Sequence, residues 1–318
     1  MQMERSQTER QGRIAQTQVY VGKFLRIFVY ERKWKTLLFA VVVAAILAFV
    51  LRDTMFITKE STRSGFFAVV SSCIWIGIFN SIQEVCRERQ VIKREHRTGL
   101  HITAYVGAHM IYQAVICLAQ SLFMTVIYRM MLNFPKEGAV SGSFCVDFFV
   151  SLFLVLYAAD MLGIAVSSLV KTPAAAMTVM PFLLIIQLIF SGSIFPITGQ
   201  AKIISDLTIS KWGQRVLCIE ADLNELPSEI LDSQMEMLEH VEVFQEFMAS
   251  LTPKEREEVT NEEYESLKEF VHDYTYRKIY TYDADLILRR WGYLLAFSLL
   301  YALIAVISLE FIDRDKRA

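Results

Sequence analysis

The chain alternates long apolar blocks with short charged segments, and this alternation constrains the fold more than any other feature. The most densely charged segment, residues 83–101 (QEVCRERQVIKREHRTGLH), lies between two apolar blocks long enough to cross a bilayer. A charge at the bilayer centre costs about 2.5–3.5 kcal/mol on insertion scales, so this segment must lie outside the hydrocarbon. With 54% hydrophobic residues and a mean hydropathy of +0.36, the chain is predicted to be a multi-pass membrane protein.

Six apolar blocks predict an all-α integral membrane protein with six transmembrane helices. Each block has roughly the twenty residues that a helix needs to cross about 30 Å of hydrocarbon, although the first is short. Within the third, His109, Gln113 and Gln120 are expected to face inward. Residues 36–196 would hold the first five spans. The predicted spans are residues 36–51, 66–82, 104–128, 144–170, 174–195 and 291–312.

The N-terminal region divides into two predicted parts, a polar linker over residues 1–18 and an amphipathic interfacial helix over residues 19–35. In the second part the apolar side chains Tyr20, Phe24 and Phe28 share one helical face, and basic residues occupy the others. This pattern is typical of a helix that lies in the membrane plane. A simple basic flank of the first span is the alternative.

The distribution of Lys and Arg predicts a plasma (inner) membrane protein with both termini in the cytoplasm. Residues 1–35 carry eight basic and three acidic residues, and the segment 83–101 is also net basic. Residues 197–290 carry twenty acidic and ten basic residues, a net charge of −10, and are expected outside. Capping patterns at Thr252–Glu255 and Thr260–Glu263, with helical periodicity over Glu229–Met248, predict a helical extracytoplasmic subdomain there. Residues 313–318 form the predicted cytoplasmic tail.

Sequence motifs of catalysis are absent from the chain. It contains no GxxxxGK[ST], GxSxG or HExxH pattern, and its five cysteines show no metal-ligand spacing. We therefore expect no enzyme site, cofactor or metal in this chain, and the charge balance gives no indication of nucleic-acid binding.

One acidic residue, Asp160, falls within a predicted span. It is either part of a proton relay or a polar contact to a neighbouring helix, and the lack of a second acid or His at relay spacing favours the contact. Around it Ala159, Gly163 and Ser167 recur every four residues, which predicts a face where two helices approach closely.

Two further segments have alternative interpretations. In Phe190–Pro196 (FSGSIFP), Gly and Pro end the fifth span, which predicts either a constriction or re-entrant turn or a plain helix end. In the charged segment, Val85, Val91, Ile92 and Leu100 interleave with the charges. That pattern favours a helix that docks a partner over a solvated connector.

Taken together, these residues resemble the transmembrane half of ATP-binding-cassette exporters of the G-subfamily kind, the type-2 permease group. The resemblance rests on the basic amphipathic helix, ERQVIKREHRTGLHITAY (88–105), the GIAVSSL…P…FSGSIFPI run and the long polar loop before the last span. It covers about Tyr20 to Asp313 except that loop. The chain looks closest to bacterial versions, including those whose ATPase half follows a forkhead-associated domain.

The resemblance implies a dimer of two permease copies that exports a hydrophobic or amphipathic substrate by alternating access. ATP and Mg would be bound by a partner ATPase domain, which the family usually carries in the same polypeptide, so the chain is either a separate subunit or the membrane part of a fusion. The implied ATPase-coupling residues are Glu84, Glu88, Arg89, Arg94, Glu95 and Gly99. The implied pathway residues are Ile76, Phe79, Asn80, Leu183 and Gln187. The implied outer gate is Phe190, Ser191, Gly192, Phe195 and Pro196.

Two other functions are compatible with the sequence. One is an ion-coupled secondary transporter in which Asp160 titrates, and the scarcity of intramembrane acid pairs argues against it. The other is a membrane sensor or scaffold whose acidic outer subdomain binds a ligand or a partner.

Overall fold

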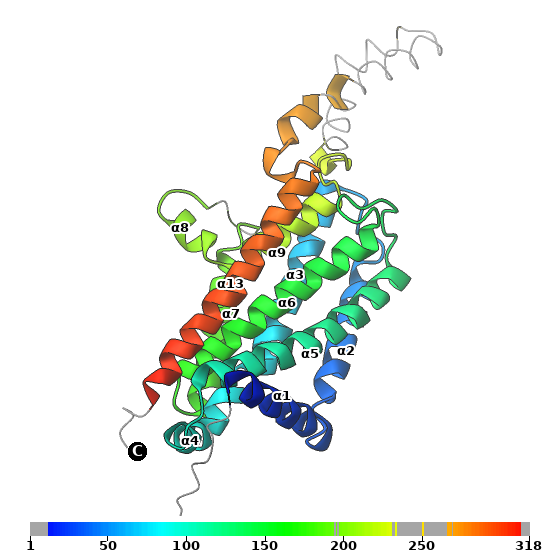
Figure 1. Cartoon of the computed structure of the whole chain (residues 1–318). Helices are drawn as coiled ribbons and strands as arrows, with labels where there is room; N and C mark the ends of the chain where they lie inside the picture. The colour runs from blue at the N-terminus through cyan, green and yellow to red at the C-terminus, as the bar shows by residue number, and fades with distance from the viewer. Residues whose placement is uncertain are drawn as a thin grey trace, which may run out of the picture.

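The computed structural model describes residues 12–312 except 194, 196, 231–232, 234–249, 251–265 and 269, and in this part the chain is an elongated bundle of helices (Figure 1). The long bundle helices are α2 (Lys35–Leu51), α3 (Lys59–Ser81), α5 (Ile102–Met131), α6 (Phe144–Leu169), α7 (Pro173–Ile189) and α13 (Ala284–Glu310). The other elements are α1 (Arg13–Tyr30), α4 (Glu84–Arg97), α8 (Ala201–Asp206), α9 (Ile209–Glu220) and the 3-10 helix η1 (Lys278–Tyr280).

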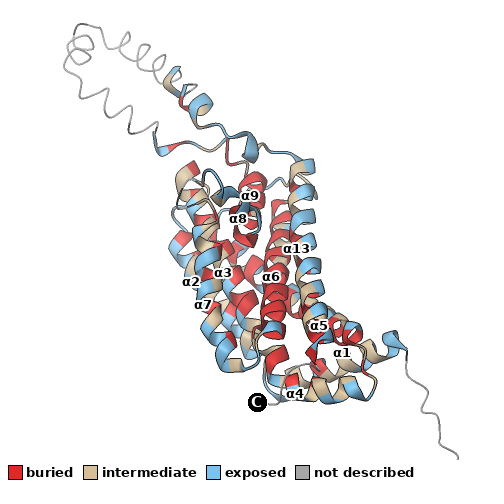
Figure 2. Cartoon of the chain, turned by 90° about the vertical axis from the view of Figure 1, so that its left-hand side faces the viewer, coloured by how far each residue is buried: buried red, intermediate tan, exposed pale blue. Residues whose placement is uncertain are grey.

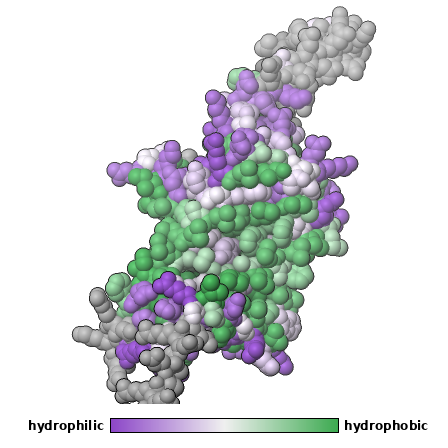
Figure 3. Space-filling view, in the orientation of Figure 1, coloured by the Kyte–Doolittle hydropathy of each residue, from purple (hydrophilic) through white to green (hydrophobic). Residues whose placement is uncertain are grey.

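Among the described residues, four helices are long and apolar enough to cross a membrane: α3, α5, α6 and α13. Helices α1 and α2 meet the requirement only together, and they are bent by 68° relative to each other. Helix α7 is apolar but has 17 residues, which rise about 26 Å. The structure thus confirms an all-helical membrane fold with four or five span candidates, where the sequence predicts six. Figure 3 shows a continuous apolar surface around the middle of the bundle and hydrophilic residues toward both ends.

Helix α6 forms the centre of the bundle, and its side chains are buried along nearly the whole length (Figure 2). Helix α3 packs against it so closely that a Cβ atom on Gly77 would lie 2.6 Å from the carbonyl oxygen of Leu156. A Cβ atom on Gly163 would likewise lie 3.1 Å from the carbonyl oxygen of Ile78. The predicted close approach along the small-residue face of α6 is confirmed.

Helix α1 crosses one end of the bundle beside α4 (Figure 1). It begins at Arg13, within the segment predicted to be a linker (residues 1–18), and ends at Tyr30, before the predicted end at residue 35. Contacts from distant residues order its first turn, because Gln16 donates to the carbonyl oxygen of Gly99 and accepts from the backbone N–H of His101.

The apolar face of α1 packs on α5. Phe24 is buried there, with its ring centroid 4.1 Å from that of His109 and 5.8 Å from that of Tyr105. The expectation that His109, Gln113 and Gln120 face inward is confirmed, since all three are buried. Gln120 accepts a hydrogen bond of 2.8 Å from Asn80 of α3, so polar groups on neighbouring helices satisfy each other.

Helix α9 enters the opposite end of the bundle. It lies within residues 197–290, the stretch predicted as an extracytoplasmic subdomain, but its side chains are buried among α3, α6 and α13. A Cβ atom on Gly213 would lie 2.7 Å from the side chain of Val155, so the backbones approach closely. The sequence prediction missed this insertion because the polar residues around α9 dominate the average hydropathy. The predicted helical patterns at Glu229–Met248, Thr252–Glu255 and Thr260–Glu263 lie almost entirely outside the described residues.

Gly77→Ala tests the contact between α3 and α6. The added methyl group meets backbone atoms of Leu156 and Asp160, which cannot rotate away. We expect a loss of about 1–3 kcal/mol in the free energy of unfolding, seen as a lower thermal midpoint in detergent. Gly107→Ala on α5 is the control, because a Cβ atom there meets open space. Equal midpoints for the two variants would contradict close α3–α6 packing.

Candidate functional site

Helix α4, formed by the charged segment, is attached to the end of α6 through the free backbone groups of both helices. The first N–H groups of a helix lack partners within it. Here the backbone N–H groups of Val85 and Cys86 donate to Ser167 Oγ of α6, at 3.1 and 3.0 Å. In return, the Arg89 guanidinium donates to the carbonyl oxygen of Ser168 at 2.7 Å and to that of Val170 at 3.3 Å. Each helix therefore caps the other.

The acidic residues of α4 face α1. Glu84 forms an ion pair with Lys33 at 2.8 Å, and Glu88 pairs with Lys23 at 3.3 Å. Glu95 accepts a hydrogen bond of 2.6 Å from the Tyr20 hydroxyl. These contacts join α4 to the amphipathic helix along three helical turns. The acids that the family resemblance assigns to ATPase coupling thus bind this chain's own α1.

The outward face of α4 is basic. Its exposed side chains are spaced three, four and three residues apart, so they share one helical face. They are Arg87, Gln90, Arg94 and Arg97. Arg87 also donates to Gln83 Oε1, one turn earlier. Because the acids are turned inward, the surface that α4 offers to a partner carries positive charge.

The six predicted coupling residues lie in four different surroundings. Glu84, Glu88 and Glu95 are half-buried against α1, whereas Arg94 lies on the exposed face. Arg89 is buried and bonds to carbonyl oxygens at the end of α6, and its role in ATPase coupling stays a prediction. Gly99 has a φ of +111°, a left-handed conformation that suits the chain reversal after α4. Sequence reasoning missed Arg87, Gln90 and Arg97, although their helical spacing was a usable signal.

A groove of 400 Å³ opens on the side of the bundle between α2, α3 and α7. Its lining is apolar except for Ser71, Ser72 and Gln187. The lining residues are Val43, Ile46, Leu47, Ala68, Ser71, Ser72, Ile74, Trp75, Leu184, Gln187 and Leu188. Gln187 also accepts a hydrogen bond of 3.1 Å from the backbone N–H of Ser210, which ties α7 to α9.

Only one of the five predicted pathway residues, Gln187, lines this groove. Ile76 is buried inside the bundle, and Asn80 is bonded to Gln120 of α5. Phe79 is exposed beside Phe39, and Leu183 is half-buried on α7 without lining the groove. The groove lies one to two turns closer to the N-terminal end of α3 than the predicted pathway residues of that helix, and α2 forms one of its walls.

The predicted outer gate is a turn folded onto neighbouring elements. The carbonyl oxygen of Phe190 accepts a hydrogen bond of 2.8 Å from Ser205. Gly192 has a φ of +79°, and its carbonyl oxygen accepts a hydrogen bond of 2.9 Å from the guanidinium of Arg63 in α3. Ser191 is buried, Phe195 is exposed, and Pro196 lies outside the described residues. Since the chain then re-enters the bundle as α9, the re-entrant interpretation is favoured over a plain helix end.

Asp160 is buried beside two other polar side chains. Cys117 Sγ donates to its Oδ2 at 3.5 Å, and Ser81 donates to its backbone carbonyl oxygen at 2.7 Å. In the described ranges no three His, Cys, Asp or Glu side chains group as metal ligands. These contacts fit a polar link between α3, α5 and α6 better than a proton relay.

Comparison with known proteins adds two findings. Residues 18–217, which run from α1 to α9, match the family described as ABC-2 type transporter. The chain is also 31% identical over 156 residues to an ABC transporter ATP-binding/permease protein of Mycobacterium tuberculosis. The matched region covers 48% of this chain and 18% of that protein, so the chain spans under a fifth of the relative's length.

Arg89→Gln tests whether α4 is fixed to α6. A hydrogen bond made by a charged group contributes about 1.5–3 kcal/mol, and this change removes the charged donor from the buried carbonyl oxygen of Ser168 and the half-buried one of Val170. We expect a lower thermal midpoint and faster amide hydrogen exchange in α4. The control Arg94→Gln removes an exposed guanidinium from the same helix and should leave both quantities unchanged. Similar exchange rates in the two variants would show that Arg89 does not hold α4.

Proposed function

The chain belongs to the ABC-2 type transporter family, and from this premise we propose that it is the permease part of an ATP-driven exporter. The Mycobacterium tuberculosis relative is named as both an ATP-binding and a permease protein, which supports an ATP-binding partner domain or subunit for this chain. That partner would bind ATP and Mg. The proposed cargo is hydrophobic or amphipathic, in keeping with a largely apolar groove on the side of the bundle.

The main observation that supports this proposal is the attachment of α4 to α6. A partner that pushes on the basic face of α4 cannot move this helix alone, because Ser167 and Arg89 join it to α6. The ion pairs to Lys23 and Lys33 join it also to α1 and to the turn that follows α1. Movement of an ATPase would therefore reach the centre of the bundle and the amphipathic helix together, as alternating access requires.

The bundle end that carries α1 and α4 is assigned to the cytoplasm. Basic residues are concentrated at this end, as the positive-inside rule expects. The last turns of α13 reach the same end (Figure 1), so both described ends of the chain would be cytoplasmic. In this arrangement α2 and α7 complete six spans, and α9 lies at the outer end.

A second copy of the chain would cover the groove between α2, α3 and α7. Helix α7 buries only one stripe of side chains within the chain, and apolar residues such as Phe182, Ile185 and Ile186 are exposed. Lipid could also cover those residues, but the groove presents the polar side chains of Ser71, Ser72 and Gln187, which suit a surface buried between proteins better than one that faces lipid. Two copies facing each other would enclose these groups in a central pathway.

The double variant Arg87→Glu/Arg94→Glu tests the docking face. Reversing both charges should abolish electrostatic attraction to an acidic partner surface and lower cargo-stimulated ATP hydrolysis at least tenfold in the full complex. Thermal stability of the permease should not change, because both side chains are exposed. Arg26→Glu, an exposed cation of α1, is the matched control. Normal stimulated hydrolysis in the double variant would refute docking at α4.

Phe182→Cys in a Cys145→Ser background tests the dimer. Among the free cysteines Cys145 is half-buried and the others are buried, so the new thiol should be the main reactive group. We expect a bifunctional thiol reagent to give a dimer band in native membranes. Phe123→Cys on α5 is the control, since it is exposed on a helix that does not pack against α7. A dimer band of equal strength from the control would argue against pairing through α7.

A further inference from the structure

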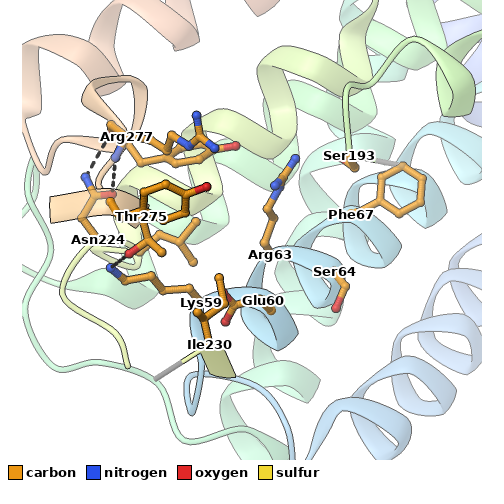
Figure 4. A pocket seen from close by; sticks show the side chains of 13 residues that line it. Lys59, Glu60, Arg63, Ser64, Phe67, Ser193, Asn224, Ile230, Thr275 and Arg277 are labelled. Carbon is orange, nitrogen blue, oxygen red and sulfur yellow. Dashed lines mark hydrogen bonds between the residues drawn. The ribbon is translucent and has the colours of Figure 1, made fainter. Parts of the chain in front are cut away.

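A pocket of 380 Å³ lies at the end of the bundle opposite α4 (Figure 4). The first turns of α3 form one wall, and Leu223 and Asn224, which follow α9, form the floor with Tyr280. Residues 274–277 close the other side. Asn224 fixes that side, because its side chain bonds both the backbone N–H and the carbonyl oxygen of Arg277. Neither the family assignment nor the groove near α7 gives this pocket a function.

Three cationic side chains line the pocket: Lys59, Arg63 and Arg277. Lys59 is 9% exposed, and its Nζ donates to the Thr275 hydroxyl at 3.1 Å. Arg63 donates one hydrogen bond to the carbonyl oxygen of Gly192, while its Nε is buried without a hydrogen-bond partner. Within the described residues, none of the three cations pairs with a carboxylate.

The one carboxylate in the lining is already occupied. Glu60 accepts a hydrogen bond of 2.7 Å from Ser228 on one oxygen and one of 3.0 Å from the backbone N–H of Glu229 on the other. It therefore anchors the turn at residues 228–229, and none of the ion pairs among the described residues joins it to the three cations. Arg277 belongs to a stretch, residues 197–290, whose net charge is −10, whereas Lys59 and Arg63 come from the first turns of α3.

Tyr280 shows how closely these charges gather. Burial raises the pKa of its phenol, whereas the positive charges of Arg63, Arg215 and Arg277 act to lower it. Arg63 and Arg277 therefore lie near this residue of the pocket lining, and Arg215 adds positive charge from outside the lining. Partly buried cations that lack an anionic partner are costly, and an anion bound among them would remove that cost.

We propose that this pocket binds the oxyanion, phosphate or carboxylate, of an amphipathic molecule. Lys59, Arg63 and Arg277 would contact the anion by charge-assisted hydrogen bonds. Phe67, Leu223 and Ile230 offer apolar surface beside them for the adjoining chain. The volume falls within the range of ordinary small-molecule sites. The inference rests on the proposed function only in treating this molecule as cargo, for which the pocket would be a site at the outer end of the pathway.

Arg63 connects the pocket to the turn after α7. The same guanidinium that would meet the anion holds the carbonyl oxygen of Gly192, and the Arg63 carbonyl oxygen accepts a hydrogen bond of 3.1 Å from Gln214 of α9. Occupation of the pocket would therefore fix α3, α9 and this turn relative to one another. A bound anion should stabilise the outer end of the bundle.

The test is binding of dodecyl phosphate to the purified full chain in an uncharged detergent, measured by titration calorimetry. Dodecylphosphocholine has the same tail with a zwitterionic head, and inorganic phosphate has the head without the tail. We expect dodecyl phosphate to bind at least tenfold more tightly than either. The variant Lys59→Gln/Arg277→Gln should weaken its binding at least tenfold. Arg277→Gln alone, at an exposed position, should weaken it without altering the thermal midpoint.

Arg52→Gln is the matched control, because Arg52 is an exposed cation at the same end of the bundle and outside the pocket. Equal affinity for dodecyl phosphate and dodecylphosphocholine would overturn the anion site, as would unchanged affinity in a folded double variant. If inorganic phosphate bound as tightly as dodecyl phosphate, the claim that the ligand is amphipathic would be overturned. These measurements need no ATPase, so their failure is distinct from failure of the docking face on α4.

Discussion

The structure depends first on the exchange of hydrogen bonds where α4 meets α6. Two helix ends, each with unsatisfied backbone groups, lie at the edge of the apolar region, where a group without a partner costs several kcal/mol. Ser167 satisfies the start of α4, and Arg89 satisfies the end of α6. The carbonyl oxygen of Ser168 also accepts from Ser308, so α13 meets the same point. A charged surface helix is thereby made part of the bundle core.

Helix α1 sets the charge of the surface that remains. Lys23 and Tyr20 of α1 and Lys33 of the turn that follows it bind the three acids of α4, and Arg87, Arg94 and Arg97 face outward. The amphipathic helix therefore does more than lie at the membrane surface. It converts a segment of mixed charge into a helix with one paired face and one basic face, which suits an acidic partner.

Helix α3 connects the two ends of the molecule. Its first turns carry Lys59 and Arg63, which line the pocket at one end of the bundle, its middle lines the groove, and its last turn leads directly into α4. Close packing of Gly77 on α6 makes this helix part of the rigid centre. A displacement at α4 and an anion at the opposite end would therefore act on one continuous element, which provides a physical route for coupling the two sites.

Local sequence determined the membrane fold, the positions of the long helices, the close-packing face of α6 and the helical nature of the charged segment. Apolar length and helical periodicity, which predict these features, depend on neighbouring residues alone. The partners of each side chain were decided only by the tertiary structure. Arg89 looked like a docking residue until α6, about eighty residues later, supplied its acceptors. The insertion of α9, the wall that α2 adds to the groove and the gathering of cations around Tyr280 also join segments far apart in the chain. Such contacts follow from packing geometry, which periodicity in a single sequence does not contain.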